Sequence, residues 1–147
     1  MSKKASGADN QQVTNLMQAR KITPDYLCGL VDGEGCFYIL ATKKFTCEFK
    51  ISQKDKRLLE QVRLFLKCGH VKSNYDKHKT WVYIVKDIKS LSEKIIPFFR
   101  KNGLIIKKEQ FVKFSEVVKL INAKEHLTVK GKEKIKRIKL GTSETTR

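Results

Sequence analysis

The segment from Phe45 to Gln53 alternates between apolar and polar side chains, and it constrains the fold more than any other stretch of the sequence. Side chains of a β-strand point alternately to the two faces of its sheet, so this period indicates a strand with one buried face. Strands of this kind belong to antiparallel sheets that are covered on one side and open on the other. The apolar set is Phe45, Cys47, Phe49 and Ile51, and the polar set is Thr46, Glu48, Lys50 and Ser52.

The rest of the sequence predicts a second strand pair, with helices before, between and after the pairs. The first helix begins at Pro24, with Thr23 as its N-cap, and stops at the glycines after Val31. The other predicted elements are strands at 36–42, 71–75 and 80–86, helices at 55–68, 87–96, 106–122 and 128–140, and a loop at 98–103. We therefore predict an α+β fold of order αββαββα, in which helices pack on one face of a four-stranded antiparallel sheet.

The chain has 147 residues, of which 40% are hydrophobic, and this is the size of one domain with a proper core. We predict a flexible N-terminal arm over 1–21, a single folded domain over 22–140 and a flexible tail over 141–147. The strand at 80–86 is apolar at nearly every position, so the sequence does not decide which of its side chains face outward. Core positions are expected for Trp81 and Tyr83.

The charge of the chain indicates a polyanionic partner. Lys and Arg number 32 against 15 Asp and Glu, which gives a net charge of +17 at pH 7. Nucleic acid and an anionic membrane surface are the main candidates. No apolar run approaches the ~18 residues of a spanning helix, and the basic residues do not gather on one amphipathic face. We expect nucleic acid as the partner, and neither a membrane nor a small-molecule substrate.

The four cysteines are Cys28, Cys36, Cys47 and Cys68, and no two of them form a C-x-x-C pair. This spacing argues against a zinc site. No signal peptide is visible at the N-terminus, so we expect free thiols in a reducing compartment and an intracellular protein that is not secreted.

Two carboxylates, Asp32 and Glu34, lie at the end of the first predicted helix. A carboxylate there faces the negative end of the helix dipole, which costs roughly 0.3–1 kcal/mol. A hard divalent cation would explain the placement, because it binds carboxylate oxygens and the free carbonyls of a helix end. An ordinary polar helix stop would explain it as well, since Asp-Gly is a common turn pair.

The segment from Leu27 to Gly35 reads LCGLVDGEG and resembles the motif of the LAGLIDADG family of homing endonucleases. Glu34 stands as the alternative to the final acid of the motif, and Cys28 and Gly33 replace two alanines. The order of predicted elements after the motif also matches the family. The positions that match or are close are Leu27, Gly29, Leu30, Val31, Asp32, Glu34 and Gly35.

The resemblance assigns roles to residues of the motif. In the family, two motif helices pack together through small residues, and Cys28, Gly29 and Gly33 would form this dimer interface. Glu34 would bind the catalytic metal, helped by the carbonyl of Gly33. The implied cofactor is Mg²⁺, with Mn²⁺ as a substitute.

The resemblance also implies catalytic residues outside the motif. A polar residue near the end of the second strand and a basic residue soon after it fall on Gln53 and Arg57. The family's lysine at the start of the helix after the second hairpin matches Lys107, with Lys108 as the near alternative. In a chain this rich in lysine, Lys107 is equally explained as a solvated charge or a phosphate contact, and so is Arg57.

One copy of the motif occurs, and family members with one motif act as homodimers. The implied function is a homodimeric, metal-dependent double-strand cut at a long pseudo-palindromic DNA site, as in intron homing, in an organelle or a prokaryotic cytoplasm. The open sheet face would read the major groove. The expected DNA-binding residues are Tyr38, Thr42, Lys44, Thr46, Glu48, Lys50, Lys72 and Asn74.

Two other functions remain open. A catalytically silent nucleic-acid binder of the same fold, such as an RNA maturase or a DNA-binding regulator, would share most of these features. The presence of Glu34 favours the enzyme, because loss of the motif acid is the mark of a silent member. A ribosomal-type RNA-binding protein would explain the charge, but it predicts neither the acid pair nor the spaced glycines.

Overall fold

The computed structural model describes residues 21–145, with side chains as far as Gly141. The predicted N-terminal arm therefore lies outside the described residues, except for Lys21. The elements are α2 (Pro24–Glu34), β1 (Gly35–Ala41), β2 (Phe45–Gln53), α3 (Lys56–Leu66), β3 (His70–Ser73), β4 (Trp81–Val85), α4 (Ile88–Ser90), η1 (Leu91–Ile95), α5 (Ile96–Asn102), α6 (Lys108–Asn122), η2 (Glu125–Leu127) and α7 (Val129–Thr145).

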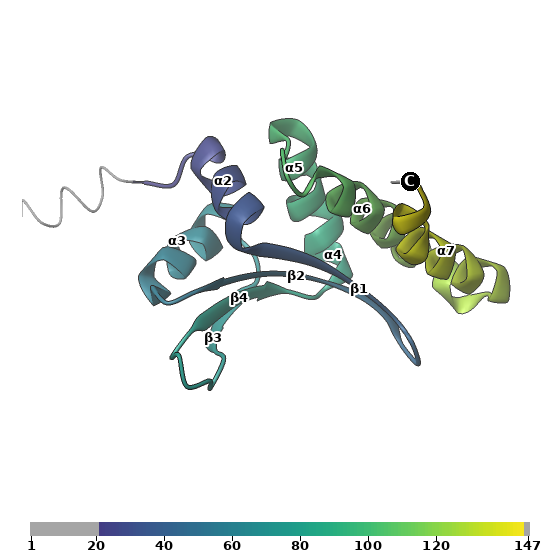
Figure 1. The fold of residues 1–147 in the computed structure, drawn as a ribbon, viewed down its shortest axis with the longest axis horizontal. Coiled ribbons are helices and arrows are strands. Elements are labelled where there is room, and N and C mark those ends of the chain that lie inside the picture. Colours follow the sequence, from purple (N-terminus) through teal and green to yellow (C-terminus); the bar gives the residue numbers. More distant parts are fainter. Residues whose placement is uncertain (1–20, 146–147) are drawn as a thin grey trace, which may run out of the picture.

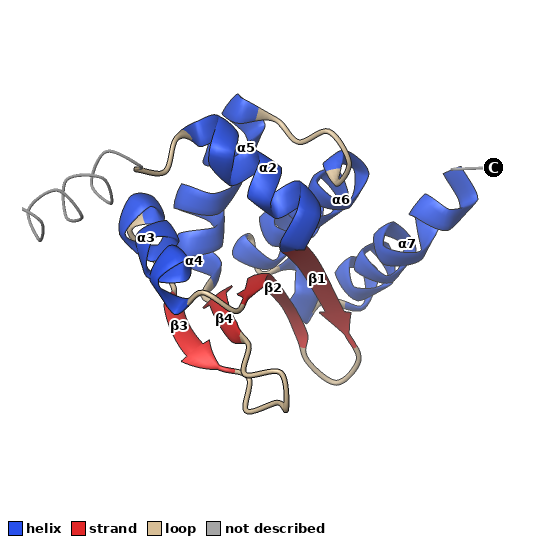
Figure 2. Ribbon diagram, turned by 60° about the vertical axis from the view of Figure 1, so that its left-hand side comes forward, coloured by secondary structure: helices blue, strands red, loops and turns tan. Residues whose placement is uncertain are grey.

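The four strands form one antiparallel sheet in the order β1-β2-β4-β3. The helices cover one face of this sheet, and the other face is open (Figures 1 and 2). The predicted α+β fold, with helices on one face of a four-stranded sheet, is confirmed. The run of apolar residues in β4 agrees with its position between β2 and β3, where Val82 to Val85 are buried on both faces of the sheet.

The two faces of the sheet differ as the alternation of β2 predicts. Phe45, Cys47, Phe49 and Ile51 point to the helices, and each is at most 8% exposed. In β4, Tyr83 and Val85 belong to the same core, whereas Val82 and Ile84 alternate with them toward the open face. Both of these outward residues are nevertheless buried, so they form an apolar floor between the polar side chains of β2 and β3.

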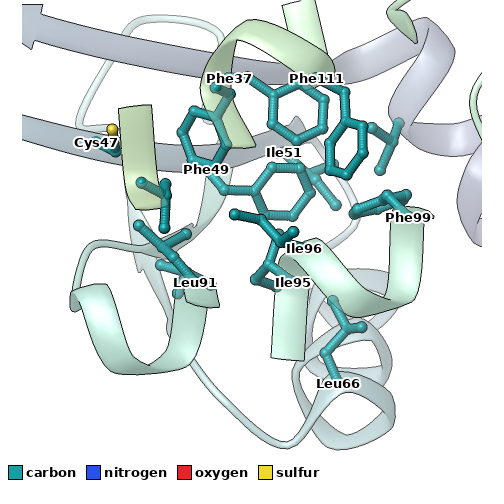
Figure 3. Packing of buried hydrophobic residues seen from close by; sticks show 14 of the residues in the cluster. Phe37, Cys47, Phe49, Ile51, Leu66, Leu91, Ile95, Ile96, Phe99 and Phe111 are labelled. Carbon is teal, nitrogen blue, oxygen red and sulfur yellow. The ribbon is translucent and has the colours of Figure 1, made fainter. Parts of the chain in front are cut away.

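Phenylalanines from strands and helices meet in the centre of the core (Figure 3). The ring of Phe37 lies 5.0 Å from that of Phe49 and 5.6 Å from that of Phe111. The ring of Phe99 lies 5.5 Å from that of Phe49. Such tilted and edge-on pairs add to the stabilisation that burial of the rings provides. This cluster joins β1 and β2 to α5 and α6, and so it fixes the helix layer on the sheet.

The helical segment from 88 to 102 differs from the sequence prediction. A helix stop at Pro97 and a loop at 98–103 were expected, but α4, η1 and α5 follow one another without a break. In the π-turn η1, the N–H of Ile96 donates to the carbonyl of Leu91. The proline comes directly after this widened turn, where the regular helical bonding has already changed, so its missing N–H and its ring are tolerated.

The last helix begins where it was predicted, after Thr128, but it ends later than predicted. The backbone N–H of Gly131 donates to Oγ1 of Thr128 over 2.9 Å, which is the N-cap bond expected for α7. The helix continues to Thr145, beyond the end predicted near Leu140. The single Gly141 does not stop it, because one glycine lowers helix stability by only about 1 kcal/mol.

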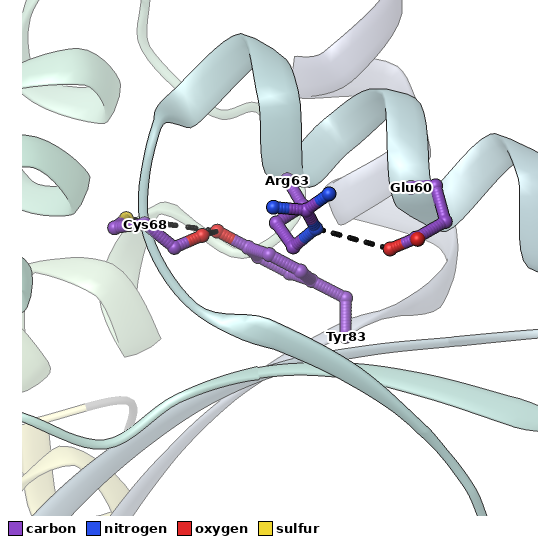
Figure 4. Close-up of polar contacts among 4 residues, drawn as sticks. All are labelled: Glu60, Arg63, Cys68 and Tyr83. Carbon is purple, nitrogen blue, oxygen red and sulfur yellow. Dashed lines mark hydrogen bonds and ion pairs between the residues drawn. The ribbon is translucent and has the colours of Figure 1, made fainter.

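The end of α3 is fastened to the sheet through Tyr83 (Figure 4). The hydroxyl of Tyr83 donates to the backbone carbonyl of Cys68 over 2.7 Å, and burial raises the pKa of this phenol. Nearby on α3, Nε of Arg63 donates to Glu60 over 3.0 Å. The four cysteines are free, and burial raises the pKa of the Cys47 thiol to about 12.

Candidate active site

The end of α2 is a sharp junction between a buried helix and the first strand. The hydroxyl of Thr23 caps the helix by accepting from the N–H of Tyr26, as predicted, and Leu27 and Val31 are fully buried. The helix runs to Glu34, three residues further than the sequence predicted. Gly35 follows because a Cβ there would lie 2.7 Å from Cγ1 of Val31. Both acids of the motif therefore stand on the last turn of the helix.

The carboxylate of Asp32 points to residues 105–107, just before α6. Its Oδ2 accepts from the N–H of Ile105 over 3.0 Å, and its Oδ1 accepts from the N–H groups of Ile106 and Lys107, each over 3.1 Å. These donors lie just before α6, whose own N-cap residue, Lys107, makes no side-chain cap bond. A carboxylate is favourable at the positive end of a helix dipole. Asp32 thus holds the three residues that lead into α6, from a helix more than seventy residues earlier in the sequence.

The ionised form of Asp32 is stabilised by this contact. Burial raises the pKa of Asp32, but the three backbone N–H donors and the charge of Lys107 outweigh that effect and hold the pKa below its usual value. The two acids of the motif are therefore not equivalent. Asp32 uses both of its carboxylate oxygens to accept backbone N–H groups, whereas Glu34 is exposed.

Lys107 reaches the same end of α2 with its side chain. Its Nζ donates to the carbonyl of Val31 over 3.2 Å and also to the carbonyl of Gly35. An ammonium group at the negative end of a helix dipole satisfies carbonyls that have no partner within the helix. Lys107, and not the exposed Lys108, is consequently the lysine that bonds to the end of α2.

Gln53 and Arg57 occupy different positions relative to this junction. Gln53 ends β2 two residues beyond Ile51, which pairs with Gly35, so it lies beside the end of α2. The amide oxygen of Gln53 accepts from the N–H of Lys54 over 2.9 Å. Arg57, in the first turn of α3, instead lines a hollow that includes Thr23 and Tyr26, near the start of α2.

Glu34 is exposed, and none of the ion pairs within the described residues involves it. No group of three or more potential ligands among His, Cys, Asp and Glu comes together in the described part of the chain. Mg²⁺ does not require such a group, because it commonly keeps several waters and binds one or two carboxylates together with substrate phosphates. A single free carboxylate at a helix end with backbone carbonyls fits this ligand preference.

The outer face of α2 has no partner within the described chain. A Cβ built on Gly29 or Gly33 meets nothing within 4 Å, so packing inside the chain does not require these glycines. Ile105 and Ile106, whose backbone N–H groups donate to Asp32 of the same helix, are 89% and 77% exposed. Cys28, which we expected to share this face, is only 9% exposed and belongs to the core.

The open sheet face carries most of the expected DNA-binding residues. Tyr38 on β1 pairs with Glu48 on β2, and Lys50 follows two residues further along β2 on the same face, joined to Glu48 by an ion pair of 3.3 Å. Thr46 and Lys72 lie on the same face, by their register on β2 and β3. The other three lie in turns. Thr42 and Lys44 are exposed between β1 and β2, and Asn74 donates to Thr80 over 2.9 Å in the second hairpin.

Comparison with known proteins agrees with this geometry. The family model described as LAGLIDADG endonuclease matches residues 27–118. The chain belongs to the LAGLIDADG endonuclease family. The matched range begins at the motif and contains Glu34, Gln53 and Lys107. A curated relative, a probable intron-encoded endonuclease of Neurospora crassa, is 35% identical over 119 residues, which are 78% of this chain and 26% of the relative.

Solved LAGLIDADG structures share the fold. The homing endonuclease I-GzeII in complex with its DNA target superposes with a TM-score of 0.75 at 32% identity, over 80% of this chain and 42% of that one. The homing endonuclease I-TnaI superposes with a TM-score of 0.74 at 32% identity, over 80% of this chain and 86% of that one. None of the helices in the described residues has the length and apolar character needed to cross a membrane.

Proposed function

We propose that the chain is a metal-dependent endonuclease that acts as a homodimer and cuts both strands of a long, pseudo-palindromic DNA site. The observation that carries this proposal is the end of α2. There an exposed carboxylate, Glu34, stands on the last turn of the helix, and the ammonium group of Lys107 donates to the carbonyls of Val31 and Gly35 at the same helix end. A carboxylate for a cation and a cation for a phosphate are the two parts that phosphodiester hydrolysis requires.

Each chain supplies its own residues to this chemistry. Glu34, with the carbonyl of Gly33, would hold a divalent cation, of which Mg²⁺ is the expected kind and Mn²⁺ the substitute. The bound ion would make a water molecule nucleophilic and stabilise the leaving oxygen. Lys107 would offset the charge that develops on the scissile phosphate. Gln53 would orient water near the end of β2, and Arg57 is proposed as a further phosphate contact.

A second copy of the chain is the proposed partner for the outer face of α2. Two glycines one helical turn apart allow close approach of another helix, and the backbone of two exposed isoleucines is bonded to Asp32 of the same helix. A twofold dimer would repeat one surface on both halves of a near-palindrome. The chain spans less than half of I-GzeII but 86% of I-TnaI, which supports one half-site per chain.

DNA is the proposed substrate because the open face of the sheet and the net charge of +17 suit a duplex. I-GzeII was solved with a DNA target, and the Neurospora relative is described as intron-encoded. Intron homing and an organellar or prokaryotic setting remain proposals on this ground.

A selection from a randomised duplex library tests the activity. The purified protein is incubated with the library in Mg²⁺, in Mn²⁺ and in a chelator, and the cut ends are sequenced. We expect cuts in both strands at one pseudo-palindromic sequence with either metal, and no cuts with the chelator. Binding of duplex without cleavage in either metal would overturn the enzyme and favour the silent binder.

A further inference from the structure

A basic hollow lies at the far end of the first hairpin, where the β1–β2 turn meets the start of α7. Its volume is about 320 Å³. Three lysines line it, two from the turn (Lys43 and Lys44) and one from α7 (Lys132), together with the imidazole of His126. None of the described acidic residues lines the hollow. Three lysines and no carboxylate in one lining favour an anion.

The α7 side of this hollow is held by short-range contacts. The hydroxyl of Thr128 donates to the carbonyl of Glu125 over 2.9 Å and accepts from the N–H of Gly131 over 2.9 Å. A Cβ on Gly131 would lie 1.7 Å from the carbonyl oxygen of Glu125, so this glycine is required for the close turn. His126 and Lys132 therefore project from a defined corner. The Nζ of Lys136 lies 5.9 Å from the centre of the Phe45 ring, which connects the same helix to the hairpin.

The described part of the chain supplies few partners for the polar side chains that line the hollow. Lys43, Lys44 and Lys132 take part in none of the ion pairs within the described residues. Nδ1 of His126 is buried without a hydrogen-bond partner there. A buried polar atom without a partner is rare in folded proteins and calls for an explanation.

We propose that this hollow binds a backbone phosphate of the DNA target, outside the part of the site that lies near the cut. The inference rests on the proposed function, because it takes DNA as the substrate. The hairpin turn lies one strand away from the end of α2, and the 7 residues of β1 span about 23 Å at ~3.3 Å per residue. At ~3.4 Å per nucleotide along one strand, the bound phosphate is roughly seven base pairs from the scissile bond.

Two double variants distinguish a specific phosphate site from a general effect of positive charge. Lys44→Ala with Lys132→Ala removes two charges from the hollow, whereas Lys89→Ala with Lys101→Ala removes two exposed charges on α4 and α5. Binding is measured in Ca²⁺ on a 40-base-pair duplex that contains the selected sequence, or on a generic duplex if no sequence is selected. The same duplex is also made with single neutral methylphosphonates at successive positions.

We expect the hollow variant to bind about tenfold more weakly at low salt and to lower the slope of log affinity against log salt by about one for each phosphate lost. The control variant should lose much less. A methylphosphonate roughly seven base pairs from the cut should weaken the wild type but not the hollow variant. Both variants should fold alike, since all four lysines are exposed, and circular dichroism checks this.

The outcomes distinguish this inference from the proposed function. Equal losses in the two variants, or no position at which a methylphosphonate affects only the wild type, would overturn the hollow as a phosphate site. Binding without cleavage would overturn the enzyme but not the hollow, because the comparison requires binding alone. If the wild type binds no duplex at low salt, both proposals are wrong.

Discussion

The two sides of α2 differ in how many contacts they make with the rest of the described chain. On the side that faces α6, Asp32 accepts three backbone N–H groups and Lys107 donates to two carbonyls. On the outer side, Gly29, Gly33 and Glu34 have no partner of this kind within the described residues. Ile105 and Ile106 show both kinds of contact, because their backbone N–H groups donate to Asp32 while their side chains are exposed. The contacts within the chain hold the site in place. The surfaces without such contacts are where we propose that the partners bind.

The largest expected effect on stability comes from the side of α2 that faces α6. Asp32→Ala removes the acceptor of three N–H groups and should lower the free energy of unfolding by about 2 kcal/mol, in the range for hydrogen bonds to a charged group. Glu116→Ala, at an exposed position on α6, is the matched control and should stay within roughly 0.5 kcal/mol of the wild type. Urea denaturation of the three proteins measures both values. An equal, small loss in both variants would show that Asp32 does not hold the junction.

Lys107→Met tests the hydrogen bonds between the Lys107 side chain and the end of α2. Loss of its contacts with the end of α2 should cost about 1 kcal/mol of stability. Cleavage should fall by about 100-fold, as for loss of a charge-stabilising donor. Lys108→Met removes the same charge one residue away and should change neither quantity. Denaturation and single-turnover cleavage of the selected duplex provide the measurements, and similar results for the two variants would remove Lys107 from the site.

The dependence of stability on pH sharpens the role of Asp32. The folded-state pKa of Asp32 is lowered, so its contribution is fully present above the unfolded value of about 3.9 and is lost as the pH falls through the folded-state value. The difference in stability between the wild type and Asp32→Asn should therefore be constant near neutral pH and shrink below about pH 4. Thermal denaturation between pH 3 and 7 checks this. A difference that does not change over the range would contradict the account.

Substitutions on the outer side of α2 should affect dimer formation and not the stability of the fold. Ile105→Glu with Ile106→Glu places charges on the proposed interface, and we expect a monomer with unchanged stability, because both side chains are already exposed. Leu64→Glu, at another exposed apolar position on α3, should leave the dimer intact. Sedimentation velocity at several concentrations distinguishes the two. A wild type that is monomeric on DNA as well as in solution would overturn the homodimer.

Local patterns predicted most of the fold. The alternation in β2 and the cap at Thr23 depend on neighbouring residues, and the structure has them as expected. The continuation of the helix through Pro97 was missed, because a π-turn leaves no clear mark in the sequence. The expectation that Glu34, Gln53, Arg57 and Lys107 share one site came from the resemblance to a family and not from spacing.

The roles within the site were harder to predict. Asp32 and Glu34 are two residues apart and chemically alike, yet one is bonded to the chain and the other is exposed. Only the return of residues 105–107 to the end of α2 separates them, and that contact depends on packing between distant segments. The hollow near Lys132 was missed for the same reason.

The most direct test of the account is cleavage of the selected duplex by Glu34→Gln, with duplex binding measured in the same preparation. Glu34 is exposed, so the change should leave folding and binding intact while removing a ligand for the cation. We predict binding within about twofold of the wild type and no detectable cut in either strand in Mg²⁺ or Mn²⁺. Cleavage at the wild-type rate by this variant would contradict the placement of the active site at the end of α2.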